Sequence, residues 1–204
     1  MAPVDLTIAE IARRIAAQPE PQAPHGEHPQ RPAAGCGQAA AVLLPLLRQG
    51  DHWRLLYIRR AHNQRDRHSG EVAFPGGCLE PGETDPVLAA LREAREEIGL
   101  EDQGVQVLGR LPPFETFSGY LVSPVVAAIP WPLALRPDPA EVAAIFSIPL
   151  AWLADPDHHE IRPWPHDRHP QARPVVFFRP YQGERLWGVS ARITLNLLEV
   201  LAVP

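Results

Sequence analysis

The chain has 204 residues, of which 45% are hydrophobic, and its formal net charge is −5. This length and composition suit one packed domain with a small appendage, and no apolar run reaches the roughly 18 residues of a membrane-spanning helix. The negative charge offers no overall basic surface, so we expect neither a nucleic-acid nor a membrane partner. Two cysteines, and an N-terminus without the pattern of a secretory signal, favour a cytoplasmic location.

The N-terminal segment is expected to be the appendage. Residues 4 to 17 predict an amphipathic helix whose apolar side carries Leu6, Ile8, Ile11 and Ile15. Five prolines between positions 19 and 32 then predict an irregular linker. We therefore separate residues 1–34, the helix and linker, from residues 35–204, the main domain. The first 33 residues are expected to be dispensable for chemistry, and the isoleucines would cover an apolar patch or stabilise a homodimer.

A hairpin and a basic segment are expected next. Ala39–Leu47 and Trp53–Arg59 predict two strands joined by a turn at residues 48–51. The basic segment that follows contains Arg60, Arg65, Arg67 and His68. A solvated basic edge is the plain interpretation. We favour anion binding, because the segment leads straight into an acidic stretch and arginine forks bind phosphate oxygens in pairs.

A glycine-rich loop and a helix form the most informative stretch of the chain. Val72–Gly77 predicts a short strand that breaks into a loop, and its two glycines would let the backbone approach a ligand or metal closely. The helix is expected to begin with Asp85 as N-cap and Pro86 at the first helical position. Gly99 suits the left-handed position just past its end.

Three carboxylates share one face of this helix, because Glu93, Glu96 and Glu97 stand at i, i+3 and i+4. The opposite face is apolar and is formed by Val87, Leu91, Ala94 and Ile98. Like charges so placed repel by roughly 0.2–0.5 kcal/mol per pair, and a hard divalent cation reverses that cost. A solvated acidic face is the competing interpretation, but it does not explain the glycines, the turn and the glutamates together. The pattern predicts a metal site for phosphate chemistry.

The remaining elements show no regular β–α alternation. We expect strands at 105–111 and 120–129, a mixed helical segment at 139–155, a hairpin from 175–179 and 186–189, and a final helix at 191–201. Residues 156–174 combine four histidines with several prolines. They lack the spacing of a zinc site, so an exposed, proline-stiffened loop is favoured. The fold class is α/β, with a mixed central sheet covered by helices on both faces.

The stretch from Gly77 through Glu83 to Arg92–Leu100 resembles the Nudix box, G-x5-E-x7-R-E-U-x-E-E-x-G-U, in which U is a bulky apolar residue. There are two departures. Eight residues, not seven, separate Glu83 from Arg92, and Ala94 is small where a bulkier residue is usual. The resemblance implies a Nudix-type α/β/α sandwich, so that residues 35–204 would be a Nudix hydrolase domain.

The segment before the box is similar to the signature of coenzyme A pyrophosphatases, LLTxR[SA]x3Rx3Gx3FPGG. Arg60, Ala61, Arg65, Gly70 and Phe74 match it. Four residues, not three, separate Arg65 from Gly70, so Arg65 or Arg67 is the counterpart of the second arginine. The resemblance implies that Arg60, Arg65, Arg67, His68 and Phe74 contact the substrate.

These resemblances imply metal-dependent hydrolysis of the diphosphate bond of coenzyme A or acyl-CoA, giving 3′,5′-ADP and (acyl-)4′-phosphopantetheine. Mg²⁺ or Mn²⁺ would be held by Glu93, Glu96, Glu97 and Gly77. These glutamates and Arg92 are the candidate catalytic group, with Arg92 and Glu83 bracing the loop and helix. A carboxylate in the box, or one from another loop such as Glu115, would accept the proton of the attacking water. The alternatives are a Nudix pyrophosphatase for another substrate, such as ADP-ribose or NADH, and a non-catalytic nucleotide-sensing Nudix domain.

Overall fold

The computed structural model describes residues 6–18, 39–62, 68–116, 119–166 and 169–202, and the side chains of 165–173 are not described. Within these ranges the elements include four α-helices: α1 Ile8–Ala16, α2 Pro86–Ile98, α3 Leu150–Leu153 and α4 Gly188–Ala202. The expected proline-rich linker lies outside the described residues. None of the described helices is both long and apolar enough to cross a bilayer.

The central sheet is mixed, as expected. Its main path runs β3-β2-β1-β7-β5, while β4 pairs with β1, β6 with β7 and β8 with β2. The β1–β7 pair is parallel, and the other pairs are antiparallel. The strands are β1 Ala39–Gln49, β2 His52–Arg60, β3 Val72–Ala73, β4 Gly76–Cys78, β5 Gln106–Arg110, β6 Phe114–Glu115, β7 Leu121–Ala128 and β8 Val142–Pro149.

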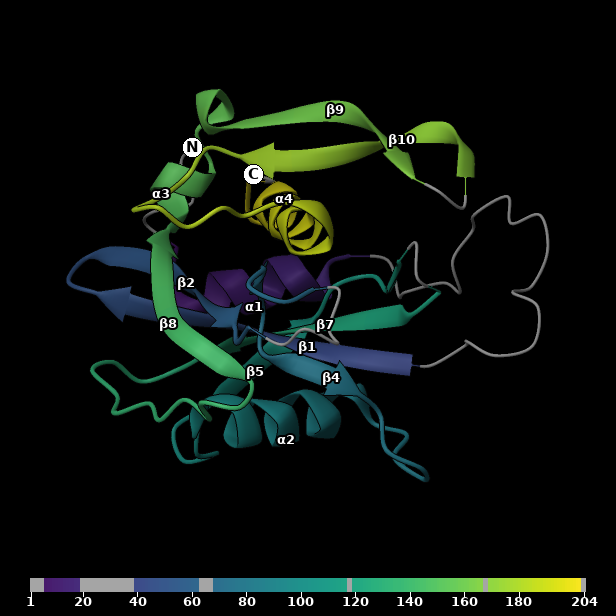
Figure 1. The fold of residues 1–204 in the computed structure, drawn as a ribbon. Coiled ribbons are helices and arrows are strands. Elements are labelled where there is room, and N and C mark those ends of the chain that lie inside the picture. The colour runs from purple at the N-terminus through teal and green to yellow at the C-terminus, as the bar shows by residue number, and fades with distance from the viewer. Residues whose placement is uncertain (1–5, 19–38, 63–67, 117–118, 167–168, 203–204) are drawn as a thin grey trace.

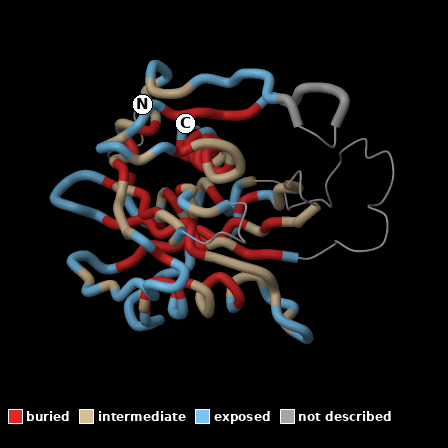
Figure 2. Tube along the Cα trace, in the orientation of Figure 1, coloured by how far each residue is buried: buried red, intermediate tan, exposed pale blue. Residues whose placement is uncertain are grey.

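Helices cover both faces of this sheet (Figure 1). On one face, α2 packs through Ala89, Ala90, Ala94 and Ile98 against residues of β1, β2 and β7. On the other face, α1 and α4 join a second, larger apolar cluster. Figure 2 shows buried segments running through the sheet and along α4. The α/β class with a mixed central sheet is therefore confirmed.

The N-terminal helix is part of the larger cluster. A capping box begins it, in which the Thr7 side chain accepts from the Glu10 backbone and the Glu10 side chain accepts from the Thr7 backbone. Ile11 and Ile15 are fully or almost fully buried, and the Trp53 indole donates to the Leu6 carbonyl at 2.7 Å. These isoleucines therefore cover an apolar surface of the chain itself, which is one of the two roles expected for them.

Two expected elements differ in the structure. Residues 139–155 are mainly strand β8, followed by the single turn α3, and not a mixed helical segment. Pairing of β8 with β2 along nearly its whole length, from Arg54↔Pro149 to Arg60↔Val142, overrides the weak helix preference of its alanines.

The described residues between 156 and 174 form a short 3₁₀ turn, Pro156–His158, and most of a second sheet rather than a loop, although residues 161–164 are exposed as expected. Strands β9 His159–His166 and β10 His169–Phe178 pair antiparallel. A two-stranded sheet has only edges, so prolines are tolerated in it, and Pro163 lies opposite Pro174. The expected return at Gln182-Gly183 is present, with Tyr181 bridged to Glu184 and Phe177 to Trp187, but the main partner of β10 is β9.

Candidate active site

Helix α2 has the boundaries expected from its sequence. The Asp85 side chain accepts from the Val87 backbone at 2.8 Å, and Pro86 occupies the first turn. Gly99 ends the helix with a φ of 65°, and the Leu100 backbone donates back to the Ala94 carbonyl at 3.2 Å. The caps set where the helix begins and ends, and packing of its apolar residues on the sheet sets its rotation, which turns Glu93 and Glu97 toward the glycine loop.

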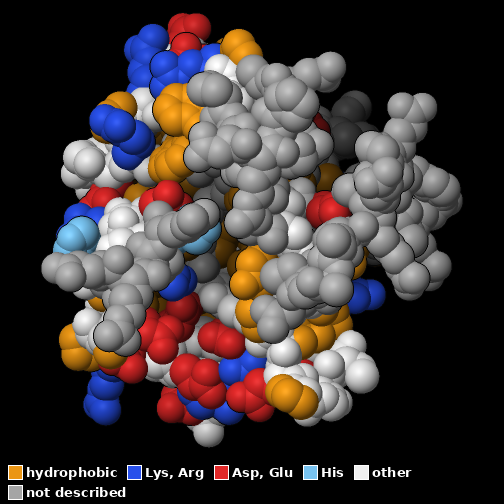
Figure 3. All heavy atoms as spheres, turned by 45° about the vertical axis from the view of Figure 1, so that its right-hand side comes forward, with side chains coloured by type: hydrophobic (Ala, Val, Ile, Leu, Met, Phe, Trp, Pro, Cys, Tyr) orange, Lys and Arg blue, Asp and Glu red, His pale blue; other side chains and the backbone are white. Residues whose placement is uncertain are grey.

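The glycine loop contacts the glutamates directly. Strand β4 is held against β1, with Ala41 opposite Gly77. The Gly76 backbone donates to Glu97 Oε2 at 2.9 Å, and Gly77 lies against the Glu93 side chain. Figure 3 shows acidic side chains gathered, with some basic ones, over the lower part of the face in view, at the height of α2 in Figure 1.

Arg92 connects the loop to the helix. Its guanidinium donates to Glu83 at 3.1 Å, to Glu93 and Glu96 at 3.0 Å, and to the Cys78 carbonyl at 3.2 Å. The hydrogen bond to Glu83 is the main cause of the raised pKa of Arg92, and the same bond lowers the pKa of Glu83. The additional residue between Glu83 and Arg92 therefore does not prevent their contact.

Burial sets the electrostatics of Glu93 and Glu97. The Glu97 residue is only 3% exposed, and this burial is the main reason that its pKa rises to about 7. The Gly76 N–H and Arg60 act in the opposite direction, whereas the charges of Glu93 and Glu141 raise the pKa further. Burial likewise raises the pKa of Glu93, where Arg92 opposes it and Glu96 and Glu141 add to it. Glu96 is the most exposed of the three, at 58% of its side chain.

Glu141 is the site residue that the sequence did not single out. It stands at the start of β8, where its carbonyl accepts from the Ala61 backbone at 2.7 Å. The preceding loop is attached to the end of α2, because Asp138 N–H donates to the Glu97 carbonyl at 2.9 Å and Arg136 N–H to the Ile98 carbonyl at 2.8 Å. No local sequence signal marked it, because residues 139–155 were expected to be a mixed helical segment, and its proximity to α2 depends on tertiary structure.

The residues of the upstream segment are placed differently from one another. Arg60 lies close enough to Glu97 to lower its pKa. His68 is exposed and its Nδ1 lies 2.9 Å from Glu71 Oε2. Phe74 is in the core, 3% exposed and stacked on Tyr57 at 4.8 Å, so its ring shapes the loop from within. Arg65 and Arg67 lie outside the described residues, and Glu115 is on β6.

The carboxylates suit a divalent cation in their chemistry. In the part of the chain that is described, no three His, Cys, Asp or Glu side chains already converge as a metal-binding group. Glu93 and Glu96 instead bond to Arg92, and Glu97 to the Gly76 N–H. Oxygen donors are the ligands that Mg²⁺ prefers, and a cation beside Glu93 and Glu97 would offset the burial and repulsion that raise their pKa.

Comparison with known proteins agrees with these features. The model of the NUDIX domain family matches residues 37–170. The relative named "Uncharacterized Nudix hydrolase NudL" from Photorhabdus laumondii subsp. laumondii is 41% identical over 165 residues, which are 80% of this chain and 85% of the relative. The protein of the same name from Escherichia coli K12 is 38% identical over 159 residues, covering 78% and 80%. A solved MutT/nudix family protein from Enterococcus faecalis aligns over 85% of this chain and 71% of its own, with TM-score 0.49 and 14% identity.

Proposed function

Because the chain belongs to the Nudix hydrolase family, we propose that it hydrolyses the diphosphate bond of coenzyme A or acyl-CoA. The products are 3′,5′-ADP and 4′-phosphopantetheine or its acyl form. The family assignment covers the coarser activity, hydrolysis of a nucleoside diphosphate derivative. The choice of coenzyme A within that class is the specific part of the proposal.

One observation supports the chemistry most: the acidic face of α2 meets the glycine loop, and Arg60 at the end of β2 lies close to Glu97. Two of its glutamates, Glu93 and Glu97, have raised pKa values because burial disfavours their charge. In this proposal Glu93, Glu96, Glu97 and the carbonyl of Gly77 hold Mg²⁺ or Mn²⁺. When bound there, the ion would neutralise charge on the diphosphate oxygens and lower the pKa of a bound water.

Three further roles are assigned to residues of the chain. We assign Glu141 as the group that accepts the proton of the attacking water, because its charge acts on both Glu93 and Glu97 from a separate loop. Arg92 is a positioning residue, since it holds Glu83, Glu93 and Glu96 in one hydrogen-bonded group. Glu83 braces the loop through Arg92 and the Glu80 backbone.

The substrate class is supported by the segment before the box. Its similarity to the coenzyme A pyrophosphatase signature assigns a basic loop to the anionic end of the substrate. Arg60 is the last residue of strand β2, where the basic segment begins, and its charge lowers the pKa of Glu97. In this proposal Arg65 or Arg67 reaches the 3′-phosphate, which lies far from the bond that is cleaved.

The direct test is a comparison of three substrates with the purified full chain. Coenzyme A, ADP-ribose and NADH are each incubated with Mg²⁺, and the products are identified by mass spectrometry. We expect the highest kcat/KM for coenzyme A, with 3′,5′-ADP as a product. A higher value for ADP-ribose or NADH would make the chain a Nudix pyrophosphatase for another nucleotide. Binding of these compounds without metal-dependent turnover of any would identify a nucleotide sensor.

A further inference from the structure

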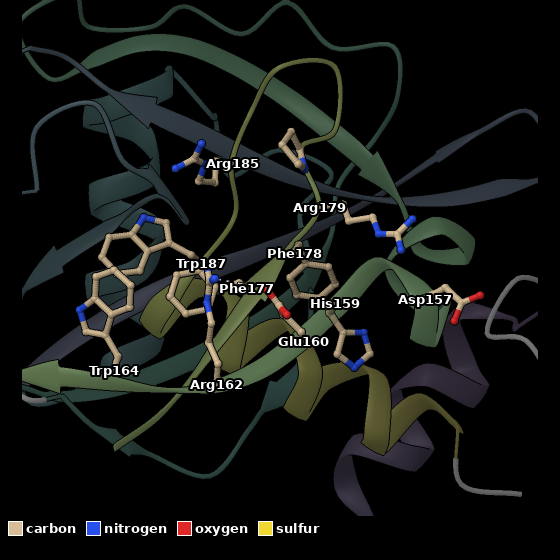
Figure 4. A pocket seen from close by; sticks show the side chains of 11 residues that line it. Asp157, His159, Glu160, Arg162, Trp164, Phe177, Phe178, Arg179, Arg185 and Trp187 are labelled. Carbon is tan, nitrogen blue, oxygen red and sulfur yellow. Dashed lines mark ion pairs between the residues drawn. The ribbon is translucent and has the colours of Figure 1, made fainter. Parts of the chain in front are cut away.

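A cavity lies on the β9–β10 hairpin, and the proposed hydrolysis does not use it (Figure 4). Its volume is about 640 Å³, within the range of roughly 300–1,000 Å³ that small-molecule sites occupy. It lies between the hairpin and the segment that leads into α4. Its walls combine aromatic and cationic side chains: Arg162, Trp164, Phe177, Arg179, Arg185 and Trp187.

This cavity is separate from the carboxylate site. Val176 and Phe178 belong to the apolar cluster that includes α4, so the alternation of the strand turns Phe177 to the other face of the hairpin. In Figure 1 the hairpin lies above α4, while α2 lies below the central sheet. The sheet and the α1/α4 layer therefore stand between the cavity and the box glutamates.

Three aromatic rings form one wall. Trp187 stacks on Phe177 at 5.7 Å with an interplanar angle of 12°, and Trp164 lies 5.4 Å from Phe177 and 6.0 Å from Trp187. Trp164 is nevertheless 41% exposed. A large indole held in place by its neighbours and open on one side is a ready platform for a flat ligand, because a base stacks on it without ordering the side chain first.

The arginines that line this cavity outnumber its two acidic residues, Asp157 and Glu160, by one. The Arg162 guanidinium lies 4.0 Å from the centre of the Phe177 ring, and its Nη1 forms an ion pair with Glu160 Oε1 at 3.5 Å. Arg185 is exposed, two residues before Trp187, and has no ion-pair partner among the residues described. Figure 4 shows Arg185 on the side of the cavity nearest the Trp187 ring. A guanidinium beside an aromatic ring can bind a nucleotide, because the guanidinium hydrogen-bonds the phosphate while the ring stacks on the base.

We propose that this cavity is a second binding site, which takes a nucleoside monophosphate with its base against Trp164 and Trp187 and its phosphate on Arg185. A cavity of about 640 Å³ and a net charge of −5 favour a free nucleotide over a nucleic-acid strand. The inference does not depend on the identity of the hydrolysed substrate.

The test is calorimetric titration of the full chain in EDTA with AMP and, in parallel, UMP. Neither ligand has a phosphoanhydride bond to cleave. We expect Arg185→Ala and Trp164→Ala each to weaken binding about tenfold or more. Arg110→Ala, an exposed arginine on β5 that does not line the cavity, and Glu97→Gln, in the carboxylate site, should stay within about twofold of the wild type. Circular dichroism checks that each variant is folded.

Four results would overturn the proposal. The first is no binding of either nucleotide at millimolar concentration. The second is binding that Glu97→Gln weakens and Arg185→Ala does not, which would place the nucleotide at the carboxylate site. The third is binding of inorganic phosphate as tight as that of AMP, which would mean that the base is not recognised. The fourth is tighter binding of a ten-residue thymidine oligonucleotide that both cavity variants abolish, which would identify a nucleic-acid site.

Discussion

Glu93 occupies the space that a side chain at Gly77 would need: a β-carbon on Gly77 would lie 2.5 Å from Glu93 Oε1. Gly77 does not have a positive φ, so this contact and not backbone strain is what alanine would disturb. We therefore predict that Gly77→Ala displaces the Glu93 carboxylate and lowers kcat roughly 100-fold, the usual consequence of a misplacement of about 1 Å in an active site.

Gly82→Ala is the matched control for this prediction. Gly82 lies in the loop before α2, has a φ of 90° and has open space around a β-carbon. This variant should lose some stability, because alanine is strained at that φ, but should keep its kcat within a few-fold. If Gly77→Ala hydrolyses coenzyme A at the wild-type rate, the Gly77–Glu93 contact has no part in catalysis.

Glu141→Gln tests the assignment of the proton acceptor. Because general-base catalysis contributes about 10²–10⁴-fold, kcat should fall by at least roughly 100-fold. The increase in melting temperature on adding Mg²⁺ should persist, since the metal is assigned to the glutamates of α2. Glu101→Gln, at an exposed position just beyond α2, serves as control. Loss of the Mg²⁺ effect together with kcat would instead make Glu141 a metal ligand.

The N-terminal helix should matter for stability. Ile11 is fully buried, so Ile11→Ala should cost about 2–5 kcal/mol of unfolding free energy in urea denaturation. Ile8 is on the same helix but 37% exposed, so Ile8→Ala should cost much less unfolding free energy. A chain starting at Ala34 should therefore be less stable, while its kcat at low temperature stays similar. Equal unfolding midpoints for the wild type and Ile11→Ala would show that the helix adds nothing to the core.

Discrimination by the 3′-phosphate tests the basic loop. We predict that coenzyme A is cleaved more efficiently than dephospho-coenzyme A, since one charge-assisted contact contributes about 1.5–3 kcal/mol, or 10- to 150-fold. Either Arg65→Ala or Arg67→Ala should reduce this ratio, and Arg48→Ala, near the end of β1, should not. Equal kcat/KM values for the two substrates in the wild type would mean that the loop does not read this phosphate.

Local signals explain which parts of the fold could be predicted from the sequence. The N-cap Asp85 and the terminal Gly99 specify the ends of α2 within the helix itself, and the carboxylate spacing then places three glutamates on one face. Strand β8 was not predicted, because its register is set by pairing with β2 rather than by its own residues. The prolines of β9 and β10 argue against strands in general and are tolerated here because their sheet has only these two strands.

The same difference between local signals and tertiary structure applies to the candidate site. Glu93, Glu96, Glu97 and Arg92 are neighbours on one helix, so their spacing alone brings them together. Glu141 approaches them only because the Asp138 and Arg136 backbones bond to the end of α2, which no sequence pattern indicates. The matching signature did not indicate that Phe74 is buried against Tyr57, because a signature records identity and not burial.

The most direct test of the account is the Mg²⁺ dependence of coenzyme A hydrolysis by Glu97→Gln. Glutamine keeps an acceptor for the Gly76 N–H and removes a charge that burial disfavours, so the melting temperature in EDTA should equal or exceed that of the wild type. Turnover should fall at least roughly 100-fold, and the stabilisation by Mg²⁺ should be lost. A folded Glu97→Gln enzyme with near-normal turnover at limiting Mg²⁺ would contradict the account.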